Sequence, residues 1–261
     1  MGIVNVTPDS FSDGGRYLDH AAAVRHGLDL AAAGAAILDV GGESTRPGAE
    51  PVSEAEELRR VVPVVRDLAS TAGVPVSVDT AKASVAEAAL EAGAVLVNDV
   101  SAGLADPEML SVVARHGAGY VAMHMIGTPR TMQDDPIYDD VVREVGEFLA
   151  ARVEAAVAAG IRSDALLVDP GIGFGKEPEH NTEILRRLNE FQSLGFPILV
   201  GTSRKSFLGA FGGGSPGERL EASLATAVLA VERGADLVRV HDVAATAKAL
   251  RITDAVIRNR T

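Results

Sequence analysis

The sequence predicts an α/β protein folded as a single (β/α)8 TIM barrel over residues 1–261. A short apolar, β-branched run recurs eight times, and a stretch with apolar residues at helical spacing lies between consecutive runs. The runs are almost wholly apolar, as parallel strands covered on both faces must be. Eight strand–helix units in 261 residues match the size of such a barrel.

Each expected strand carries a polar residue at or just after its end. In chain order the strands are IVNV (3–6), ILDV (37–40), VSVD (76–79), LVND (96–99), VAMH (121–124), LLVD (166–169), ILVG (198–201) and VRVH (238–241). The carboxyl ends of all strands of a barrel face one mouth. We therefore expect eight polar residues to converge there, namely Asn5, Asp39, Asp79, Asn98, Asp169, Lys205, Arg239 and His241.

Stretches rich in Ala, Leu and Glu supply the expected helices, most clearly 21–34, 53–70 and 140–160. Ser53 is the expected N-cap of the second of these, with Glu56 closing a capping box. Several helices are expected to stop at glycine, which readily takes the left-handed conformation of a helix end. These glycines are Gly34, Gly93, Gly117, Gly160 and Gly234.

A doubly wound open sheet is the rival fold. Such a sheet usually has fewer strands and a glycine-rich first turn over a dinucleotide. The first turn here is VTPDSFS, which lacks that fingerprint. We find no linker or shift in composition that would divide the chain, and a turn between helices explains GAFGGGSPGE (209–218). We therefore predict one barrel in one domain.

Composition excludes several classes of partner and site. The formal charge of −12 disfavours binding to a nucleic-acid backbone, which needs a basic face. The chain has no cysteine for a disulfide or a thiolate-bound metal, and His124 has no second histidine at ligand spacing, so we expect it to be structural. We see no signal peptide and no run long enough to span a membrane. These features favour a cytoplasmic protein without nucleic-acid or membrane partners.

Two glycine-containing segments are candidate ligand loops. DPGIGFGK (169–176) fails the P-loop pattern, because Pro170 stands where glycine is needed and Glu177 where Ser or Thr is needed. A tight turn explains its glycines but does not explain Asp169. GTSRKSFLG (201–209) opens a helix whose free N–H groups favour anions.

Basic residues strengthen the interpretation of the second segment as an anion site. In barrels, the loops after strands seven and eight often hold phosphate. Arg204 and Lys205 lie in the first of these loops, and Arg239 and His241 arrive on the neighbouring strand. A capped helix with solvated basic residues explains the segment equally well alone, but the neighbouring strand favours an anion.

Seven segments together carry a resemblance to a known family. They are NVTPDSFSDGG, DVGGESTRPGA, VSVDT, VNDVSAG, DPGIGFGK, GTSRKSF and RVHD. In this order, and over essentially the whole chain, they are similar to bacterial dihydropteroate synthase. The resemblance implies a barrel that joins 6-hydroxymethyl-7,8-dihydropterin pyrophosphate to p-aminobenzoate and releases pyrophosphate, with Mg2+ as cofactor. It also implies a transferase of folate biosynthesis that sulfonamides target.

The resemblance assigns the pterin to Asp79, Asn98, Asp169 and Lys205. The aminopyrimidinone edge of a pterin carries adjacent N–H donors, so a carboxylate, Asp169, is the expected clamp. Asp79 and Asn98 would meet other ring nitrogens. Lys205 would donate to the ring carbonyl.

The resemblance assigns the pyrophosphate to Arg46, Arg239 and His241, and the metal to Asn5. Mg2+ prefers oxygen ligands and usually binds through few protein groups together with phosphate and water. One asparagine oxygen beside the pyrophosphate would therefore suffice on the protein's side.

Catalysis in this family is expected to be dissociative, with pyrophosphate leaving before the arylamine attacks. The cation spread over the pterin then needs a nearby carboxylate, for which Asp79 is the candidate. Neutralising the leaving group is the other requirement. Lys205, Arg239 and His241 complete the expected catalytic set.

The p-aminobenzoate site is implied to form from the first two loops and the helix after strand seven. Ser206 and the N-terminus of that helix would hold the carboxylate, and Asp13 would help to close the first loop. The other expected contacts are Phe11, Thr45, Pro47 and Phe174. Sulfonamides mimic this substrate, so the same residues would govern sensitivity to them.

Two alternative functions stay open. The resemblance also raises two further points, the start of the chain and the oligomeric state. The alternatives are a pterin-dependent methyltransferase, which has no need of STRPG and RKSF, and a non-catalytic pterin-binding paralogue. Family members usually carry residues before strand one that plug the barrel base, so here we expect either a truncated start or a less covered base. The family also implies a homodimer, for which 222–234 is a candidate surface.

Overall fold

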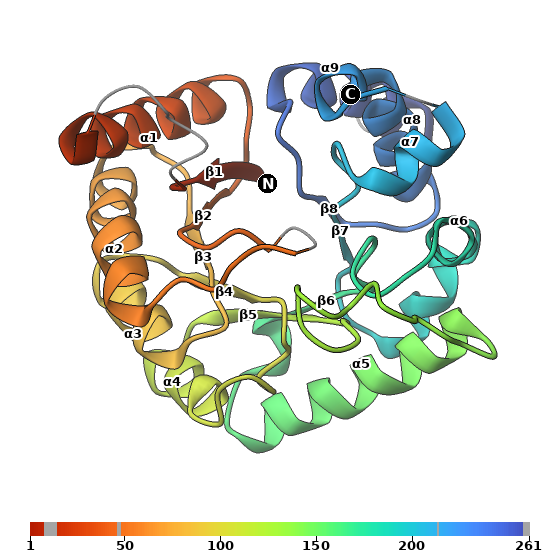
Figure 1. Ribbon diagram of the computed structural model, residues 1–261, viewed down its shortest axis with the longest axis horizontal. Coiled ribbons are helices and arrows are strands. Elements are labelled where there is room, and N and C mark those ends of the chain that lie inside the picture. The colour runs from red at the N-terminus through yellow and green to blue at the C-terminus, as the bar shows by residue number, and fades with distance from the viewer. Residues whose placement is uncertain (8–14, 46–47, 213, 258–261) are drawn as a thin grey trace.

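A computed structural model of the chain has parallel strands at its centre and helices around them (Figure 1). It describes residues 1–7, 15–45, 48–212 and 214–257, with the backbone alone for 15–19 and 216. Four predicted site residues, Phe11, Asp13, Arg46 and Pro47, lie outside the described residues.

The strands close into a ring. The first six form one parallel sheet in chain order: β1 (Gly2–Asn5), β2 (Leu38–Gly41), β3 (Val76–Asp79), β4 (Leu96–Asp99), β5 (Gly119–Met123) and β6 (Leu166–Asp169). A second parallel pair is β7 (Leu199–Val200) and β8 (Leu237–Val238). Single bridges from Val168 to Ile198 and from Gly2 to Val240 join the two sheets. The predicted (β/α)8 barrel is thereby confirmed.

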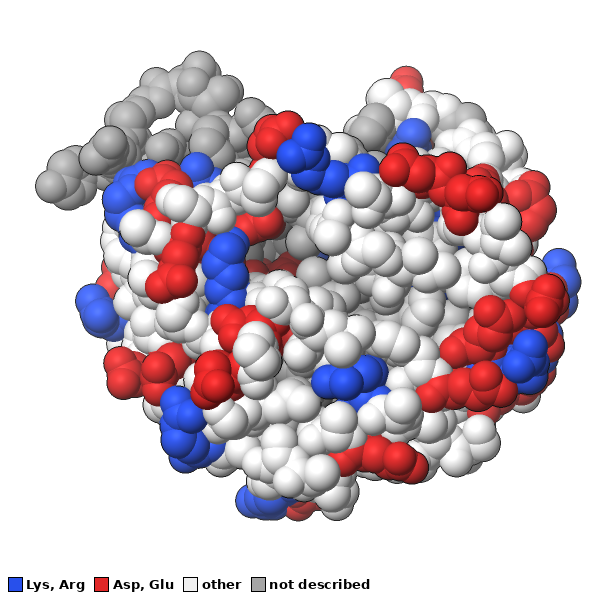
Figure 2. Space-filling view, turned by 60° about the horizontal axis from the view of Figure 1, so that its bottom comes forward, with Lys and Arg blue, Asp and Glu red and all other residues white. Residues whose placement is uncertain are grey.

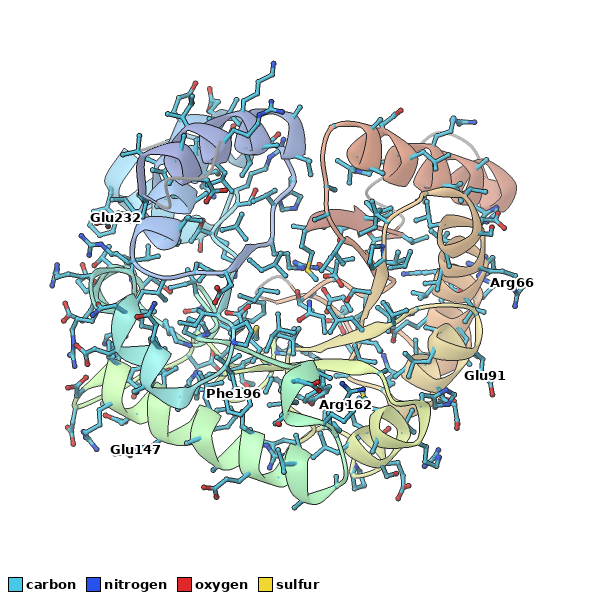
Figure 3. The ribbon with its side chains drawn as sticks, turned by 180° about the vertical axis from the view of Figure 1, so that it is seen from behind. Arg66, Glu91, Glu147, Arg162, Phe196 and Glu232 are labelled. Carbon is cyan, nitrogen blue, oxygen red and sulfur yellow. The ribbon has the colours of Figure 1, made fainter. Side chains whose placement is uncertain are left out.

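Helices surround the strands on the outside. They are α1 (Gly15–Ala32), α2 (Glu54–Thr71), α3 (Ala83–Glu91), α4 (Met109–His116), α5 (Val141–Ala158), α6 (Pro178–Arg186), α7 (Ser206–Gly212), α8 (Leu220–Glu232) and α9 (Val243–Ile257). Short 3-10 turns are η2 (Ser163–Ala165), η3 (Leu188–Leu194) and η4 (Pro216–Glu218). Seen from behind, the labelled charged side chains of α2, α3, α5 and α8 point away from the barrel (Figure 3). The helices therefore bury one face on the strands and leave the other to water.

The predicted boundaries differ from the observed ones at the ends of elements. Strands seven and eight are shorter than 198–201 and 238–241, because only two residues of each pair in the ladder. Beyond them single bonds continue the ring, such as the one from the Arg239 N–H to the Val200 carbonyl at 2.9 Å. Past β8, Val240 still pairs with Gly2, so the ring stays closed where these residues approach the mouth.

The local signals at helix ends are confirmed, with one exception. All five predicted terminal glycines have a positive φ. The Ser53 hydroxyl accepts a bond from the Glu56 N–H at 3.3 Å, as an N-cap should. The capping box predicted with Glu56 is wrong, because its carboxylate binds the Arg59 and Arg60 side chains. Charge-assisted bonds to arginine compete successfully with a backbone N–H.

The barrel interior changes character from one end to the other. Towards the amino ends of the strands an apolar cluster of Met1, Leu96, Val121 and Leu199 fills it. Towards the carboxyl ends the buried side chains are polar, and they include Asp39, Asp79, Asn98 and Asp169. Buried charges need partners, so this end of the barrel is where ligand-binding groups are expected.

Candidate active site

Arg239, in the segment after β8, organises the polar end of the barrel. Its Nε donates to Asp39 Oδ2 at 2.6 Å, and its Nη2 donates to Asp79 Oδ2 at 2.6 Å. The same oxygen of Asp39 accepts a second bond, from Asn98 Nδ2 at 3.1 Å. One guanidinium thus links carboxylates on β2 and β3, and Asn98 on β4 joins the same network. Acidic and basic side chains meet at a hollow near the middle of the face drawn in Figure 2.

The register of the sheet explains why these residues meet. Asn5, Gly41, Asp79 and Asn98 are successive partners across β1 to β4. Gly41 and Asp79 are direct neighbours, since a Cβ added at Gly41 would lie in ordinary contact with the Asp79 Cβ at 3.4 Å. The predicted convergence of Asp79, Asn98 and Arg239 is therefore present in the structure.

Asp79 has an unusual titration. Burial raises the pKa of Asp79 to about 7, while the Arg239 guanidinium lowers it and the Asp39 carboxylate raises it further. Desolvation disfavours the charged carboxylate more than a single shared arginine favours it. Asp79 therefore changes charge close to neutral pH.

Asp169 ends β6 and lies beside Lys205 on the far side of the mouth. Burial raises the pKa of the Asp169 carboxyl, and the Lys205 ammonium opposes that shift. Asp169 Oδ1 accepts the Gly171 N–H at 2.7 Å. Burial lowers the pKa of Lys205 to about 8, although Asp169 favours its charged form. Asp169 is therefore a buried acceptor, and Lys205 is a half-buried donor beside it at the mouth.

Phe174 and Lys205 touch one another. The Lys205 ammonium lies 4.4 Å from the centre of the Phe174 ring, and it also donates to the Ile172 carbonyl. Phe174 is buried in a cluster with Met123 and Met132. An aromatic ring beneath a cation is a favourable pairing, and it places Phe174 next to the predicted pterin lysine.

The loop after β6 needs its glycines. Gly171 has φ +68°, and a Cβ there would lie 1.9 Å from the His124 carbonyl oxygen. The Tyr138 hydroxyl donates to the Gly175 carbonyl at 2.7 Å, and Gln133 donates to the Gly173 carbonyl at 3.1 Å. The connection after β5 therefore clamps this loop, and only glycine fits at the closest approach.

Lys176, the lysine of the failed P-loop pattern, lies outside the mouth network. Its Nζ is 2.9 Å from His124 Nδ1 and donates to the Phe174 carbonyl at 3.0 Å. His124 packs edge-on against Phe148 at 4.8 Å. Burial lowers the pKa of Lys176 well below its usual value and the pKa of His124 to about 3. The structure is consistent with a structural role for His124.

The other described site residues lie around this centre. Ser203 Oγ is 3.1 Å from His241 Nδ1, which fixes the imidazole beside the loop that carries Lys205. Ser206 is exposed at the first position of α7, and Thr45 is half-buried in the connection after β2. Arg204, which the sequence grouped with the anion site, instead pairs with Asp242 at 2.5 Å.

The residues present fit a magnesium ion only if substrate oxygens complete its shell. Among the described residues, no three Asp, Glu, His or Cys side chains are grouped to hold a metal. Asn5 offers one carboxamide oxygen, half-buried at the end of β1 and in register with Gly41. Mg2+ commonly binds through one or two protein groups, phosphate and water, and this donor set matches that pattern.

Two features of the site have no role in the sequence-based account. Asp39 was one of the converging residues, but it had no assigned partner. Lys82 binds Glu43 and the buried Glu57, which fixes the start of the connection after β2. The sequence does carry a signal for them: Asp39 stands in an otherwise apolar strand and Glu57 on the buried face of a helix. A buried charge needs a partner.

In the part of the chain that the structure describes, no helix is long and apolar enough to cross a membrane.

Comparison with known proteins gives one consistent result. The sequence pattern of the family described as "Pterin binding enzyme" matches residues 1–241.

Curated and solved relatives agree with that match. Dihydropteroate synthase of Synechocystis sp. is 46% identical over 259 residues, which are 99% of this chain and 90% of the relative. A Yersinia pestis dihydropteroate synthase, solved with a sulfonamide drug complex, superposes with a TM-score of 0.94 at 46% identity and covers 100% of this chain and 94% of its own. A Xanthomonas albilineans dihydropteroate synthase with 4-aminobenzoic acid gives 0.93 at 52% identity, with 98% and 92% covered.

Proposed function

The chain belongs to the pterin-binding enzymes and, among them, to the dihydropteroate synthases, and we propose that its barrel mouth divides the work of that reaction as follows. The chain is a transferase that condenses 6-hydroxymethyl-7,8-dihydropterin pyrophosphate with p-aminobenzoate. The products are 7,8-dihydropteroate and pyrophosphate. The observation that carries this is the network of Arg239, Asp39, Asp79 and Asn98 at the mouth of a barrel whose relatives share the activity.

The pterin binds between Asp169 and the β3–β4 side of the mouth. Asp169 accepts the N–H donors of the aminopyrimidinone edge, and Lys205 donates to the ring carbonyl. Asp79 and Asn98 meet the remaining ring nitrogens. Their burial supports these roles, because a polar ring of matching pattern satisfies the donors and acceptors that their bonds within the protein leave unused.

The pyrophosphate binds at Arg239 and His241, with Arg46 from the connection after β2. Arg239 is only partly used by its two carboxylates, since a guanidinium has five N–H donors. Asn5 would hold Mg2+ beside the bound pyrophosphate. The ion, when bound, supplies positive charge that stabilises the leaving group.

p-Aminobenzoate binds last, over the bound pterin. Phe174 lies against Lys205 and supplies the apolar floor. Ser206 at the start of α7 holds the carboxylate, and Thr45, Pro47 and Phe11 come from the connections after β2 and β1. Asp13 belongs to the connection after β1 and helps to close it. The sulfonamide and 4-aminobenzoic acid present in the solved relatives support a site of this chemistry.

The reaction proceeds without a covalent enzyme intermediate. Arg239 and His241 neutralise the charge that grows on the departing pyrophosphate. Asp79, ionised above its pKa of about 7, faces the cation that develops on the pterin. One preorganised group contributes about 3 kcal/mol to such a transition state. Lys205 holds the pterin still while the arylamine nitrogen attacks, and several groups share the acceleration.

The enzyme acts in the cytoplasm as a homodimer. Support for a dimer comes from apolar side chains left in water on neighbouring helices: Phe211 of α7 is 63% exposed and Leu229 of α8 is 46% exposed. Patches of this kind commonly mark protein interfaces. Light scattering on the wild type should give twice the chain mass, and Leu229→Glu should shift it to one chain mass; an unchanged monomer in both would refute the dimer.

The activity is tested by incubating the protein with the pterin pyrophosphate, p-aminobenzoate and Mg2+, and measuring 7,8-dihydropteroate by mass spectrometry. We expect product in proportion to enzyme and time. A matched reaction supplies a methylated tetrahydropterin and a corrinoid acceptor, which the alternative methyltransferase would use. Product from the second mixture alone would overturn the assignment.

A further inference from the structure

We infer that Asp39 is a positioning residue that sets the pyrophosphate arginine and the pterin asparagine from one carboxylate oxygen. The inference deepens the proposed function and rests on it, because Arg239 and Asn98 are the groups that Asp39 holds. Asp39 itself belongs to neither substrate site.

The first argument is burial. Asp39 is 0% exposed, whereas Asp79 is 8% exposed and the Arg239 side chain 19%. Among the described residues, Oδ1 of Asp39 is buried without a partner, and Oδ2 accepts both recorded bonds. A buried carboxylate with one oxygen unsatisfied is costly to keep. In return, this carboxylate holds Asn98 of β4 and Arg239 after β8 in place.

The second argument is the geometry of the guanidinium. Arg239 uses Nε for Asp39 and one N–H of Nη2 for Asp79. Three of its five N–H donors remain, on Nη1 and Nη2. The Nε bond is the one nearest the aliphatic stem, so it fixes where the outer nitrogens lie. Asp39 is therefore the pivot, and the outer edge of Arg239 is the part that meets an anion.

The two carboxylates consequently differ in function. Asp79 titrates near neutral pH because burial raises its pKa to about 7, so its bond to Arg239 weakens as it gains a proton. The Nε bond to Asp39 lies deeper and keeps the guanidinium in place during that change. Arg239 can then exchange Asp79 for pyrophosphate without moving its stem.

The first test is Asp39→Asn, which keeps the shape but removes the charge. We expect the Kd for inorganic pyrophosphate, measured by calorimetry, to rise about tenfold or more, since a charged partner of a buried arginine is lost. The Kd for 6-hydroxymethyl-7,8-dihydropterin should rise less, about threefold, through Asn98. The KM for p-aminobenzoate should stay within about twofold. Equal changes in all three quantities would indicate a merely structural residue and overturn the inference.

Asp99→Asn is the matched control. Asp99 is also 0% exposed and ends β4 next to Asn98, but it accepts bonds from Tyr120, Ser101 and Gly103. Its loss should lower the melting temperature without separating pyrophosphate affinity from p-aminobenzoate KM. The same separation in this control would count against a specific role for Asp39.

The second test is a cycle with Arg239→Ala. If Asp39 acts through Arg239, then adding Asp39→Asn to Arg239→Ala should cause no further loss of pyrophosphate affinity. It should also raise the melting temperature, because it removes a buried carboxylate that has lost its arginine. Additive losses of affinity, or a lower melting temperature, would contradict the inference. This arm holds even if Asp39→Asn alone does not fold.

Failure of the proposed function is distinguishable from failure of this inference. A wild type that binds pyrophosphate but forms no dihydropteroate would sink the function and leave the cycle interpretable. A wild type that turns over normally, with Asp39→Asn unchanged in pyrophosphate affinity, would sink the inference alone.

Discussion

Two lysines bracket the loop after β6, and only one of them belongs to the site. Lys205 reaches the loop from the β7 side, donates to the Ile172 carbonyl and lies over the Phe174 ring. Lys176 ends the same loop, lies 2.9 Å from His124 and donates to the Phe174 carbonyl. The Asp169 carboxylate raises the pKa of both lysines, against the effect of burial.

Their surroundings separate them. Lys205 is half-buried, faces Asp169 and Asp79, and has its pKa lowered only to about 8, so it is mostly charged at neutral pH. Lys176 is 3% exposed among neutral acceptors, and burial lowers its pKa well below the usual value. A lysine becomes a ligand group through the carboxylates around it and its access to the mouth, not through a glycine-rich motif.

Replacing Lys205 should have the largest effect. Lys205→Met removes the donor to the pterin carbonyl and one cation of the mouth. We expect kcat/KM for the pterin pyrophosphate to fall about 100-fold to 1,000-fold, as for loss of one preorganised donor. The matched variant is Lys176→Met, which should stay within about threefold of wild type. Comparable losses in both variants would erase the distinction between the two lysines.

The pH dependence of the same kinetic parameter should follow two groups of the mouth. Lys205, with its pKa lowered to about 8, loses its proton above that pH, and Asp79, with its pKa raised to about 7, gains one below it. The profile of kcat/KM should therefore fall on both sides, about tenfold per pH unit well beyond each pKa. Lys205→Arg should move the alkaline limb upward and leave the acid limb in place. An unmoved alkaline limb would assign it elsewhere.

Lys176 should affect stability rather than rate. Its pKa is lowered in the folded protein, so the unfolded chain binds more protons below the usual pKa of 10.5 and the wild type loses stability as pH falls. Lys176→Met lacks this loss. Its stability relative to wild type should therefore rise as the pH falls below about 10, by at most about 1.4 kcal/mol per pH unit. Urea unfolding at several pH values measures this difference in stability, and a difference independent of pH would contradict the lowered pKa of Lys176.

Replacing Phe174 should have a smaller kinetic effect than replacing Lys205, because its side chain carries no charge. Phe174→Leu keeps the backbone carbonyl that Lys176 uses and removes the ring beneath Lys205. We expect the KM for p-aminobenzoate to rise about threefold to tenfold, in line with a lost aromatic contact. Initial rates at saturating pterin pyrophosphate measure it. A larger effect on the pterin than on the arylamine would relocate the ring to the other subsite.

The comparison also shows what the sequence could and could not provide. The strands, the terminal glycines and Ser53 depend on neighbours a few residues away, and those predictions are confirmed. The order of polar strand ends predicted Asp79, Asn98 and Arg239 at one mouth, because barrel geometry brings strand ends together.

The sequence could not predict side-chain partners that lie far apart in the chain. Asp39 and Arg239 are 200 residues apart, and nothing in ILDV says which cation its aspartate meets. The Glu56 capping box failed for the same reason at short range, because two arginines outcompete the N-cap N–H. Side-chain choices among several charged neighbours depend on packing, which periodicity does not report.

One experiment tests the central claim most directly: dihydropteroate formation by the wild type, Lys205→Met and Lys176→Met, measured side by side with pterin pyrophosphate, p-aminobenzoate and Mg2+. We predict turnover by the wild type, near-wild-type turnover by Lys176→Met and a loss of about 100-fold or more in Lys205→Met. No product from the wild type above an enzyme-free blank, or equal rates in all three proteins, would contradict a dihydropteroate synthase site at this mouth.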